Sequence, residues 1–367
     1  MQHTFFAPGR INLIGEHIDY NGGLVLPIAI NLGIMAKVCF RRDTIINIES
    51  AQLKEALHID LETEKYEKRA VSWQNYPLGV LEYFKKNNLP ISAADISLSS
   101  NLPIGGGLSS SAALEVLISF VMLSAVKHDL LNEKTKIAQF CQQVENEFVG
   151  VKCGIMDQFA VAKGKKNQAM LLNCDTLENE YIPFDLQNKY SLVLMNTNKK
   201  RELADSKYNE RKAECDAALL EIQAYKNINY LCEANISDAE KLKNSILQKR
   251  AKHVISENER VKKAVVALKN KKLKEFGQLM NESHESLKKD YEVTGFELDT
   301  LVNICQKNEA CIGARMTGAG FGGCAIALVK KENAGIFGAK TKQEYDEKTG
   351  LSLDVYETTA CEGVRKM

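Results

Sequence analysis

The sequence carries almost no excess of charge of either sign. Its 48 lysines and arginines stand against 47 aspartates and glutamates, which leaves a net charge of +1 at pH 7. A balanced chain has no general attraction for nucleic acids or for anionic membrane surfaces, because both depend on a surplus of basic residues. We therefore expect neither a nucleic-acid partner nor a membrane partner.

The sequence also lacks a long hydrophobic run. Its most apolar stretch, Ala112 to Val126, is interrupted by Glu115, Ser119 and Ser124 and is too short to cross a bilayer. The N-terminus has no basic segment followed by an apolar one, which is the pattern of a signal peptide. These absences predict a cytoplasmic protein in which Ala112 to Val126 forms a core helix.

Paired cysteines are absent as well. The ten cysteines are scattered, and none belongs to a Cys-x-x-Cys pair or to a zinc-like cluster. In a chain of 367 residues this pattern indicates reduced thiols rather than a disulfide scaffold, and it makes a structural zinc site unlikely. The chain has no internal repeat, and its length is sufficient for two domains or one large one.

A glycine-rich turn that leads into a helix pattern is the most informative stretch present, Leu102 to Val116. The glycines Gly105–Gly107 permit positive φ and a close approach of backbone N–H groups to a ligand. Ser109–Ser111 follow where helix N-caps belong, and a helix N-terminus suits a polyphosphate. No Gly-Lys-Ser/Thr follows the glycines, so the turn is not the common P-loop. An ordinary glycine-rich turn capped by serine remains the alternative.

The first strand pattern ends in a cluster of ionisable residues. Alternation predicts that Ile11 and Leu13 face inward while Arg10 and Asn12 face outward, with a break at Gly15.

The residues after the break, Glu16, His17 and Asp19, suit hydrogen bonding to a polyol, because carboxylates accept from vicinal hydroxyls and imidazole can donate or accept. A metal site and a solvated turn are the two alternatives.

A single acid, Asp157, lies in the apolar segment Lys152 to Phe159. Most aspartates in such a setting are helix N-caps. The functional interpretation is a carboxylate held near a reacting hydroxyl, with a cation such as Arg10 keeping it ionised.

Periodicity predicts a β-rich start, a mixed middle and a strongly helical part after residue 202. The expected strands are Leu24–Ile30, Ile34–Phe40, Thr44–Ile48, His58–Leu61, Ala94–Ser99, Ala169–Leu172, Tyr190–Met195 and Cys324–Val329. The expected helices are Trp73–Lys85, Ala112–Val126, Glu133–Phe148, Asp205–Tyr225, Asp238–Lys249, Glu257–Lys269 and Lys272–Leu287. We place the domain boundary between residues 185 and 186.

Two further patterns have simple interpretations. Lys241 to Glu275 holds 12 basic residues against 3 acids, but these are spread around amphipathic helices and indicate a solvated face rather than a nucleic-acid site. Ala314 to Cys324 contains Gly-x-Gly-x-x-Gly, yet it opens onto a strand instead of a helix, so a dinucleotide fold is excluded. We expect this second glycine-rich loop to come close to the first.

Three separated segments together resemble the galactokinases, a family of the GHMP small-molecule kinase superfamily. Gly9 to Asn21 matches the signature that distinguishes galactokinases from their relatives, while Pro103 to Ala113 and Met316 to Gly323 match the phosphate loop and the third motif of the superfamily. Cys153 to Gln158 resembles the catalytic segment of the family. Further similarity covers Asn198–Asn209, Arg250–Val254 and Asp290–Val293.

The resemblance implies a role for each matching residue. Asp157 would be the catalytic carboxylate facing the anomeric hydroxyl, as a base or as an aligning acceptor, and Arg10 would stabilise both that carboxylate and the transferred phosphoryl group. The sugar would be held by Glu16, His17, Asp19, Gly154 and Tyr208. The triphosphate would be wrapped by Gly105, Gly106, Gly107, Leu108, Ser109, Ser110 and Ser111, and Mg²⁺ would be held by Ser111 and Glu145.

The implied fold is α+β, the two-lobed GHMP kinase fold. Residues 1–185 would form an N-terminal domain resembling ribosomal protein S5 domain 2. Residues 186–367 would form a C-terminal domain with an antiparallel sheet and helices on one side, and the active site would lie in the cleft between the two domains.

The implied function is transfer of the γ-phosphoryl group of ATP to the C1 hydroxyl of D-galactose with Mg²⁺, by a protein expected to be a monomer. The alternatives are a kinase of N-acetylgalactosamine or arabinose and a non-catalytic sensor of galactose and ATP.

Overall fold

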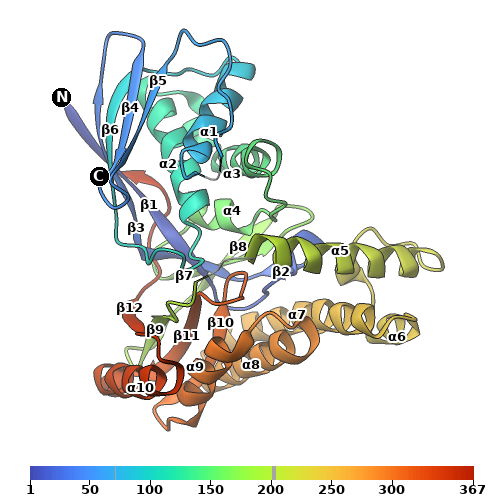
Figure 1. Cartoon of the computed structure of the whole chain (residues 1–367). Coiled ribbons are helices and arrows are strands. Elements are labelled where there is room, and N and C mark those ends of the chain that lie inside the picture. Colours follow the sequence, from blue (N-terminus) through green and yellow to red (C-terminus); the bar gives the residue numbers. More distant parts are fainter. Residues whose placement is uncertain (71, 201–203) are drawn as a thin grey trace.

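The protein, described here by a computed structural model over residues 1–70, 72–200 and 204–367, consists of two lobes that meet at a cleft (Figure 1). The strands are β1 (Gln2–Asn12), β2 (Leu24–Val25), β3 (Pro27–Phe40), β4 (Ile45–Ser50), β5 (Glu55–Asp60), β6 (Ala94–Ser100), β7 (Gln168–Asn173), β8 (Asn179–Pro183), β9 (Tyr190–Asn196), β10 (Cys311–Thr317), β11 (Cys324–Lys330), β12 (Asp354–Thr358) and β13 (Arg365–Lys366). The helices are α1 (Asn75–Lys86), α2 (Ser110–Ala125), α3 (Lys134–Gln143), α4 (Met156–Lys163), α5 (Ala204–Gln223), α6 (Ile236–Lys241), α7 (Ser245–Lys269), α8 (Leu273–Ser286), α9 (Gly295–Lys307) and α10 (Ala334–Thr349). Short 3₁₀ turns are η1 (Asp19–Asn21), η2 (Asp129–Asn132), η4 (Leu231–Glu233) and η6 (Lys331–Asn333), and π-helical turns are η3 (Val144–Val149) and η5 (Leu287–Tyr291).

Each lobe is a sheet covered by helices. Within the described residues the N-terminal lobe has a six-stranded sheet of order β13-β1-β3-β6-β4-β5 and a smaller sheet β2-β7-β8, and the C-terminal lobe has the antiparallel sheet β10-β11-β9-β12. Helices α2 and α4 pack on β1 and β3, while α8 and α9 pack on β10 (Figure 1). The GHMP kinase architecture expected from the sequence is therefore present, and none of the described helices has the length and apolarity to cross a bilayer.

The core helix α2 is buried on almost every side. The sheet strands β1 and β3 cover one face, and α1, α3 and α4 cover the others. This position explains why its sequence is apolar nearly all round instead of amphipathic. The expectation of a core helix over residues 112–126 is confirmed.

The C-terminus returns to the N-terminal lobe. Strand β13 pairs antiparallel with β1, with Phe6 opposite Arg365. A domain boundary between residues 185 and 186 would assign β13 to the C-terminal domain, although β13 belongs to the N-terminal sheet. The position of the boundary stays a prediction.

The predicted break between two strands at Asn31–Gly33 is wrong, because β3 runs without interruption from residue 27 to residue 40. Gly33 lies opposite Pro8, where the register of β1 shifts, and a Cβ on Gly33 would stand 2.3 Å from the carbonyl oxygen of Ala7. The glycine thus permits two strands to approach closely rather than marking a turn.

The predicted outward orientation of Arg10 and Asn12 is also wrong. Both side chains are buried, with exposed fractions of 5% and 0%. They do lie on the face opposite Ile11, but the phosphate loop and the C-terminal lobe cover that face, as the contacts of Arg10 with Gly107 and of Asn12 with Thr317 show.

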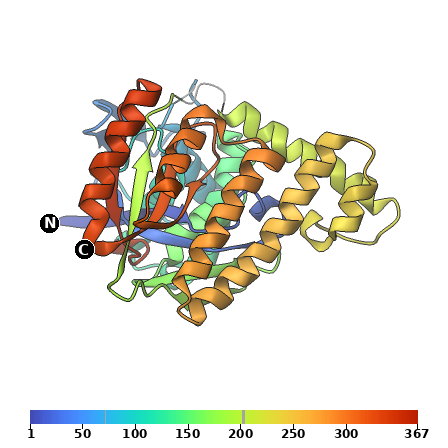
Figure 2. The same cartoon turned by 90° about the horizontal axis from the view of Figure 1, so that it is seen from below.

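The helices predicted at 238–249 and 257–269 are wrong in their bounds. The structure has a short α6 and one 25-residue helix α7, which Asn244 caps by accepting from the N–H of Ile246. The apolar pattern is interrupted by His253 and Glu257, which are buried but have hydrogen-bond partners in other elements. Figure 2 shows α7 and α8 side by side, with α5 and α6 packed beyond α7.

Other predicted elements agree more closely. The helix expected at 133–148 is α3 followed by the π-helical turn η3, which carries Glu145. The strand expected at 324–329 is confirmed as β11, which pairs with β10 around the second glycine-rich loop, while β8 and β10 are strands that the sequence did not indicate.

Helix α7 fixes the turn that follows β1. The Glu257 carboxylate accepts from the Gly15 N–H at 2.9 Å, from the Ser283 hydroxyl at 2.6 Å and from Arg260 Nε at 2.7 Å. Burial opposes the charge of Glu257, but Arg260 and its other cationic neighbours outweigh burial and lower the pKa of Glu257 to about 2.

Replacing Glu257 with glutamine tests this anchor. Because the pKa of Glu257 is lower in the folded protein than in the unfolded chain, its negative charge stabilises the fold at pH values above the pKa of the unfolded chain. Glu257→Gln should therefore lose on the order of 3 kcal/mol of unfolding free energy at pH 7. The difference in unfolding free energy between the two proteins should become smaller as the pH falls below the pKa of Glu257 in the unfolded chain, and it should be roughly halved near pH 3. Denaturant titrations of both proteins across this range measure it, and a deficit that does not change with pH would contradict the assignment.

Candidate functional site

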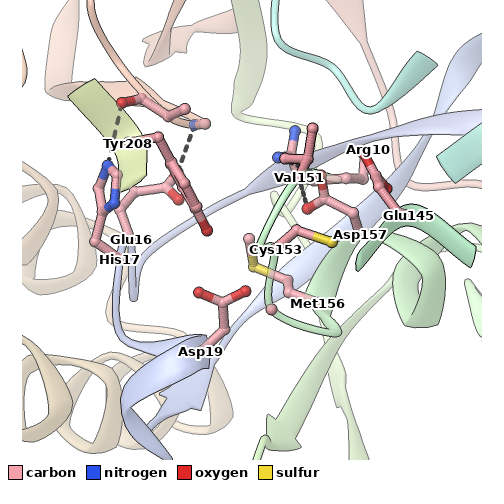
Figure 3. Close-up of a pocket in the computed structure, with 13 residues that line it drawn as sticks. Arg10, Glu16, His17, Asp19, Glu145, Val151, Cys153, Met156, Asp157 and Tyr208 are labelled. Carbon is pink, nitrogen blue, oxygen red and sulfur yellow. Dashed lines mark hydrogen bonds and ion pairs between the residues drawn. The ribbon is translucent and has the colours of Figure 1, made fainter. Parts of the chain in front are cut away.

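A cavity of about 140 Å³ opens between the two lobes (Figure 3). Every residue that the sequence assigns to the sugar or to catalysis lines it, together with Glu145 from η3. The lining residues are Arg10, Glu16, His17, Asp19, Glu145, Val151, Cys153, Gly154, Met156, Asp157, Tyr208, Gly318 and Ala319. Segments from the start, middle and end of the chain thus meet at one place, which we call the acceptor pocket.

Arg10 and Asp157 form a two-point ion pair at the floor of this pocket. Arg10 Nε donates to Asp157 Oδ1 at 2.7 Å and Arg10 Nη2 donates to Oδ2 at 2.9 Å. Asp157 is the second residue of α4, and the N-cap position is Ile155, so the N-cap alternative for Asp157 is wrong. The pairing expected between Asp157 and a cation such as Arg10 is present.

The phosphate loop is attached to the same ion pair. Arg10 Nη1 donates to the Gly107 carbonyl at 2.7 Å, and the Arg10 backbone N–H donates to the Leu108 carbonyl at 3.1 Å. Gly105 and Gly107 have φ values of +69° and +70°, which glycine adopts at little cost. The loop then enters α2, whose first N–H groups have no partner within the helix.

Ser109 does not act as the helix cap that its position suggests. It stands at the N-cap of α2 in a left-handed conformation, with φ +61°, and its side chain makes no cap hydrogen bond. Its hydroxyl instead donates to Asp157 Oδ2 at 2.7 Å. Ser110 and Ser111 form the first turn of α2, so only Ser109 links the serine run to Asp157 in the hydrogen bonds of the described residues.

A second cavity, of about 180 Å³, lies on the other side of the phosphate loop. Trp73, Tyr76, Leu53 and Ile104 form apolar walls, and Gly105, Ser110 and Ser111 form its border with the loop. Aromatic and aliphatic walls beside a phosphate site suit a planar base. The sequence indicated Trp73 and Tyr76 only as one face of a helix, so this cavity was missed.

Glu16 joins the two lobes. Its Oε1 accepts from the Gly318 N–H at 2.7 Å and from the Thr317 hydroxyl at 3.1 Å, and its Oε2 accepts from Asn12 Nδ2 at 3.2 Å. The side chain is 1% exposed, so the solvated-turn alternative for this cluster is wrong. The described residues contain no group of three or more His, Cys, Asp or Glu side chains that could hold a metal ion, which leaves the metal alternative without support.

His17 is engaged through both ring nitrogens. Nδ1 lies 2.8 Å from the Tyr20 hydroxyl and Nε2 lies 3.1 Å from the Ala319 carbonyl. Burial and the neighbouring His253 lower the pKa of His17 to about 3, so the ring is neutral. Nε2–H therefore donates to Ala319, and Nδ1 accepts from Tyr20, whose hydroxyl is 2.8 Å from that of Tyr291.

Asp19 faces the open centre of the pocket (Figure 3). Burial and the Asp157 carboxylate raise the pKa of Asp19 to about 7. A Cβ at the neighbouring Gly154 would lie 1.9 Å from Asp19 Oδ2, so a larger residue there would displace the Asp19 carboxylate.

Tyr208 extends from α5 onto the pocket. Its ring centroid is 5.5 Å from that of His17 and 5.4 Å from that of Tyr20. Burial and the Asp19 carboxylate raise the pKa of Tyr208 well above its usual value, so the hydroxyl remains a donor. The resemblance at residues 201–203, within Asn198–Asn209, lies outside the described residues.

Negative charge is concentrated behind the phosphate loop. Glu145 accepts from Gln158 Nε2 at 2.7 Å, and the fully buried Glu115 of α2 has no hydrogen-bond partner for either oxygen among the described residues. Burial, followed by the charges of Glu145 and Asp157, raises the pKa of Glu115 well above its usual value. The Glu145 carboxylate and the Ser111 hydroxyl are oxygen ligands of the kind that a hard divalent cation prefers.

Several contributors to the site could not be found from local sequence. Glu115, Glu257 and Arg315 are isolated charges inside helix or strand patterns. Glu257 and Arg315 have partners more than two hundred residues away, at Gly15 and Asn12. For the second cavity, the best signal in the sequence was Trp73, the single tryptophan, because large aromatic side chains often form binding surfaces.

Comparison with known proteins shows which family the chain belongs to. A galactokinase galactose-binding signature matches residues 1–39, the GHMP kinases N terminal domain matches residues 75–165, and the GHMP kinases C terminal domain matches residues 264–345. The galactokinase of Clostridium tetani is 50% identical over 365 residues, which cover 98% of this chain and 92% of that protein. The galactokinase of Clostridium beijerinckii is 48% identical and covers 100% of this chain and 95% of that protein.

Solved structures give the same result. The crystal structure of Lactococcus lactis galactokinase complexed with galactose has a TM-score of 0.94 at 40% identity, and the match covers 100% of this chain and 95% of that chain. The mevalonate kinase of Methanococcus jannaschii, at 21% identity and a TM-score of 0.70 over 99% of this chain and 98% of that chain, shares the fold alone. With a family signature, full-length relatives and matching architecture, the chain belongs to the galactokinase family of the GHMP kinases.

Proposed function

We propose that this protein transfers the γ-phosphoryl group of ATP to the anomeric (C1) hydroxyl of D-galactose and so forms galactose 1-phosphate and ADP. The observation that supports this most strongly is the position of Asp157, which contacts Arg10 in the acceptor pocket and Ser109 in the phosphate loop. A sugar hydroxyl in the pocket and a γ-phosphoryl group on the loop would therefore meet at this carboxylate.

ATP would bind across the phosphate loop. Its base would occupy the cavity walled by Trp73 and Tyr76, and its phosphates would accept from the N–H groups at the start of α2 and in Gly105–Ser111. The helix dipole favours the negative charge at that end. The loop carries no lysine of its own, so Arg10 supplies the nearest described cationic side chain in direct contact with it.

Galactose would occupy the acceptor pocket. Glu16, Asp19 and the Tyr208 hydroxyl would bind its hydroxyls, while Gly154 leaves room for Asp19. Both ring nitrogens of His17 are hydrogen-bonded to protein groups, so His17 would support sugar binding by holding Ala319 and by forming part of the pocket wall. This assignment differs from a direct hydrogen bond to the sugar, which the family pattern implies.

The Asp157 oxygens are not equivalent. Oδ2 accepts from both Arg10 and Ser109, whereas within the described part of the chain Oδ1 accepts only from Arg10 Nε. A carboxylate oxygen has two acceptor positions, so Oδ1 retains one for the sugar hydroxyl. Arg10 would then keep the carboxylate oriented and stabilise the negative charge of the transferring group.

Mg²⁺ would be held by Ser111 and Glu145, whose oxygens and acidic surroundings suit it. When bound, the ion neutralises charge on the β- and γ-phosphates. Gln158 would orient Glu145, because its amide donates to one carboxylate oxygen. A monomeric state and a cytoplasmic location stay predictions.

A coupled ADP-release assay with Mg-ATP tests the proposal. Galactose should be turned over in preference to N-acetylgalactosamine, L-arabinose and glucose, and removal of Mg²⁺ with EDTA should abolish turnover. Preference for another of these sugars would identify a sister kinase. Binding of galactose and ATP without turnover would identify a sensor and contradict the proposed activity.

Asp157→Asn tests the carboxylate. Because the amide cannot take a proton and presents an N–H toward Arg10, kcat should fall by roughly 10² to 10⁴, while galactose still binds. Steady-state kinetics together with calorimetric galactose binding separate the two effects. A loss in kcat below about tenfold would remove Asp157 from proton transfer.

The raised pKa of Asp19 leads us to expect that sugar binding depends on pH. Its pKa in the free site is about 7, and only the ionised carboxylate accepts from two hydroxyls, so galactose affinity should rise from pH 6 to pH 8 and then level off. Binding at pH 7 should release about half a proton, as the free carboxyl is then half protonated. Calorimetry in two buffers of different ionisation enthalpy measures this release. Asp19→Asn should abolish it, and wild-type binding without proton release would rule out the assignment.

A further inference from the structure

Arg315 lies in β10, in the C-terminal lobe, and has no solvent-exposed surface. Its Nη1 donates to the Asn12 carbonyl at 2.9 Å and lies 3.4 Å from Glu16 Oε1. Both of those partners belong to the N-terminal lobe. Its Nε and Nη2 have no hydrogen-bond partner among the residues that the structure describes.

A buried guanidinium with two unpaired nitrogens is unfavourable by itself, because it has lost the hydration that it has in the unfolded chain. What offsets this cost is the charge around it. Glu16 lies against Nη1, and Arg315 also contributes to the lowered pKa of Glu257. Arg315 therefore lies against one buried carboxylate, Glu16 of the acceptor pocket, and its charge also acts on a second, Glu257.

The two oxygens of Glu16 are held in different ways. Oε1 is directed to the C-terminal lobe, where the Gly318 N–H donates to it. Arg315 Nη1 and the Thr317 hydroxyl lie within reach of both Oε1 and the Asn12 carbonyl. Oε2 accepts from Asn12, and Glu16 lines the pocket. With Oε1 facing these donor groups of one strand and its following loop, Oε2 is the oxygen left for a ligand.

We infer that Arg315 is a positioning residue for sugar recognition, which holds Glu16 across the two lobes so that its second carboxylate oxygen faces the acceptor. Arg315 does not touch the sugar and acts through Glu16. The inference rests on the proposed role of Glu16 in binding the sugar. It adds a residue outside the acceptor pocket that determines how well this carboxylate is placed.

Lysine at position 315 is the conservative test. Lys keeps the charge but has one nitrogen in place of the planar fork, so it cannot reproduce contacts with both Asn12 and Glu16. We expect Arg315→Lys to weaken galactose binding by about tenfold, while the affinity for Mg-ADP changes less than about twofold. Isothermal calorimetry gives both values, and Arg315→Met provides a second variant without charge.

Arg250→Lys is the matched control. Arg250 is also a buried arginine of the C-terminal lobe, but it pairs with Glu214 and Glu292, and none of these three residues lines the acceptor pocket. It should lose thermal stability without loss of galactose affinity. Equal weakening of galactose binding by Arg250→Lys and Arg315→Lys would overturn the inference, because the effect would then be a general one on the lobe.

A double-mutant cycle with Glu16→Gln decides whether Arg315 acts through Glu16. The double variant should bind galactose within about twofold of the weaker single variant, whereas independent effects would multiply and overturn the inference. If Glu16→Gln weakens galactose binding and Arg315→Lys does not, the inference alone fails. If Glu16→Gln itself leaves galactose affinity unchanged, the proposed role of Glu16 fails, and the inference fails with it.

Discussion

The ion pair between Arg10 and Asp157 is the interaction on which the rest of the site depends. Arg10 belongs to β1, Asp157 to α4, and the same guanidinium donates to the Gly107 carbonyl of the phosphate loop. Ser109 completes the connection from the loop back to Asp157. Three elements that are distant in the sequence are thereby held in one geometry, and this fixes the acceptor pocket relative to the triphosphate site. Such preorganisation matters because phosphoryl transfer depends mainly on positioning and on charge stabilisation.

The C-terminal lobe completes the site by contacts with the turn after β1. Gly318 and Thr317 bind Glu16, Ala319 binds His17, and Glu257 of α7 binds the Gly15 N–H. The contacts of Glu16 and Glu257 are buried, so their polar groups are satisfied only when the two lobes are together. The residues that we propose to bind the sugar therefore also hold the two lobes together.

The parts of the site that local sequence could predict are those in which one segment contains the chemical signal. The glycines and serines of residues 105–111, the ionisable cluster at Glu16–Asp19 and the isolated Asp157 were all recognisable. The structure places the cluster and Asp157 in one pocket and joins the loop to it through Gly107 and Ser109. Their partners were not predictable in the same way. That Arg10 would be buried, or that Ser109 would turn to Asp157 instead of capping α2, depends on which elements pack together.

The same limit explains the errors in the fold. The local sequence around Gly33 indicates a turn, but in the structure this glycine allows β1 and β3 to approach closely. The polar residues His253 and Glu257 read locally as a helix boundary, but they are buried in one continuous helix because other elements supply their hydrogen bonds. In both cases a tertiary contact reverses what the local pattern indicates.

The central claim is that the sugar hydroxyl and the γ-phosphoryl group meet directly at Asp157. The stereochemical course of transfer tests this most directly, with ATP made chiral at the γ-phosphorus by oxygen isotopes and the configuration of the sugar phosphate product read by ³¹P NMR. One in-line transfer between adjacent sites predicts inversion at phosphorus. Retention would require two successive transfers through a phosphorylated side chain and would contradict the account.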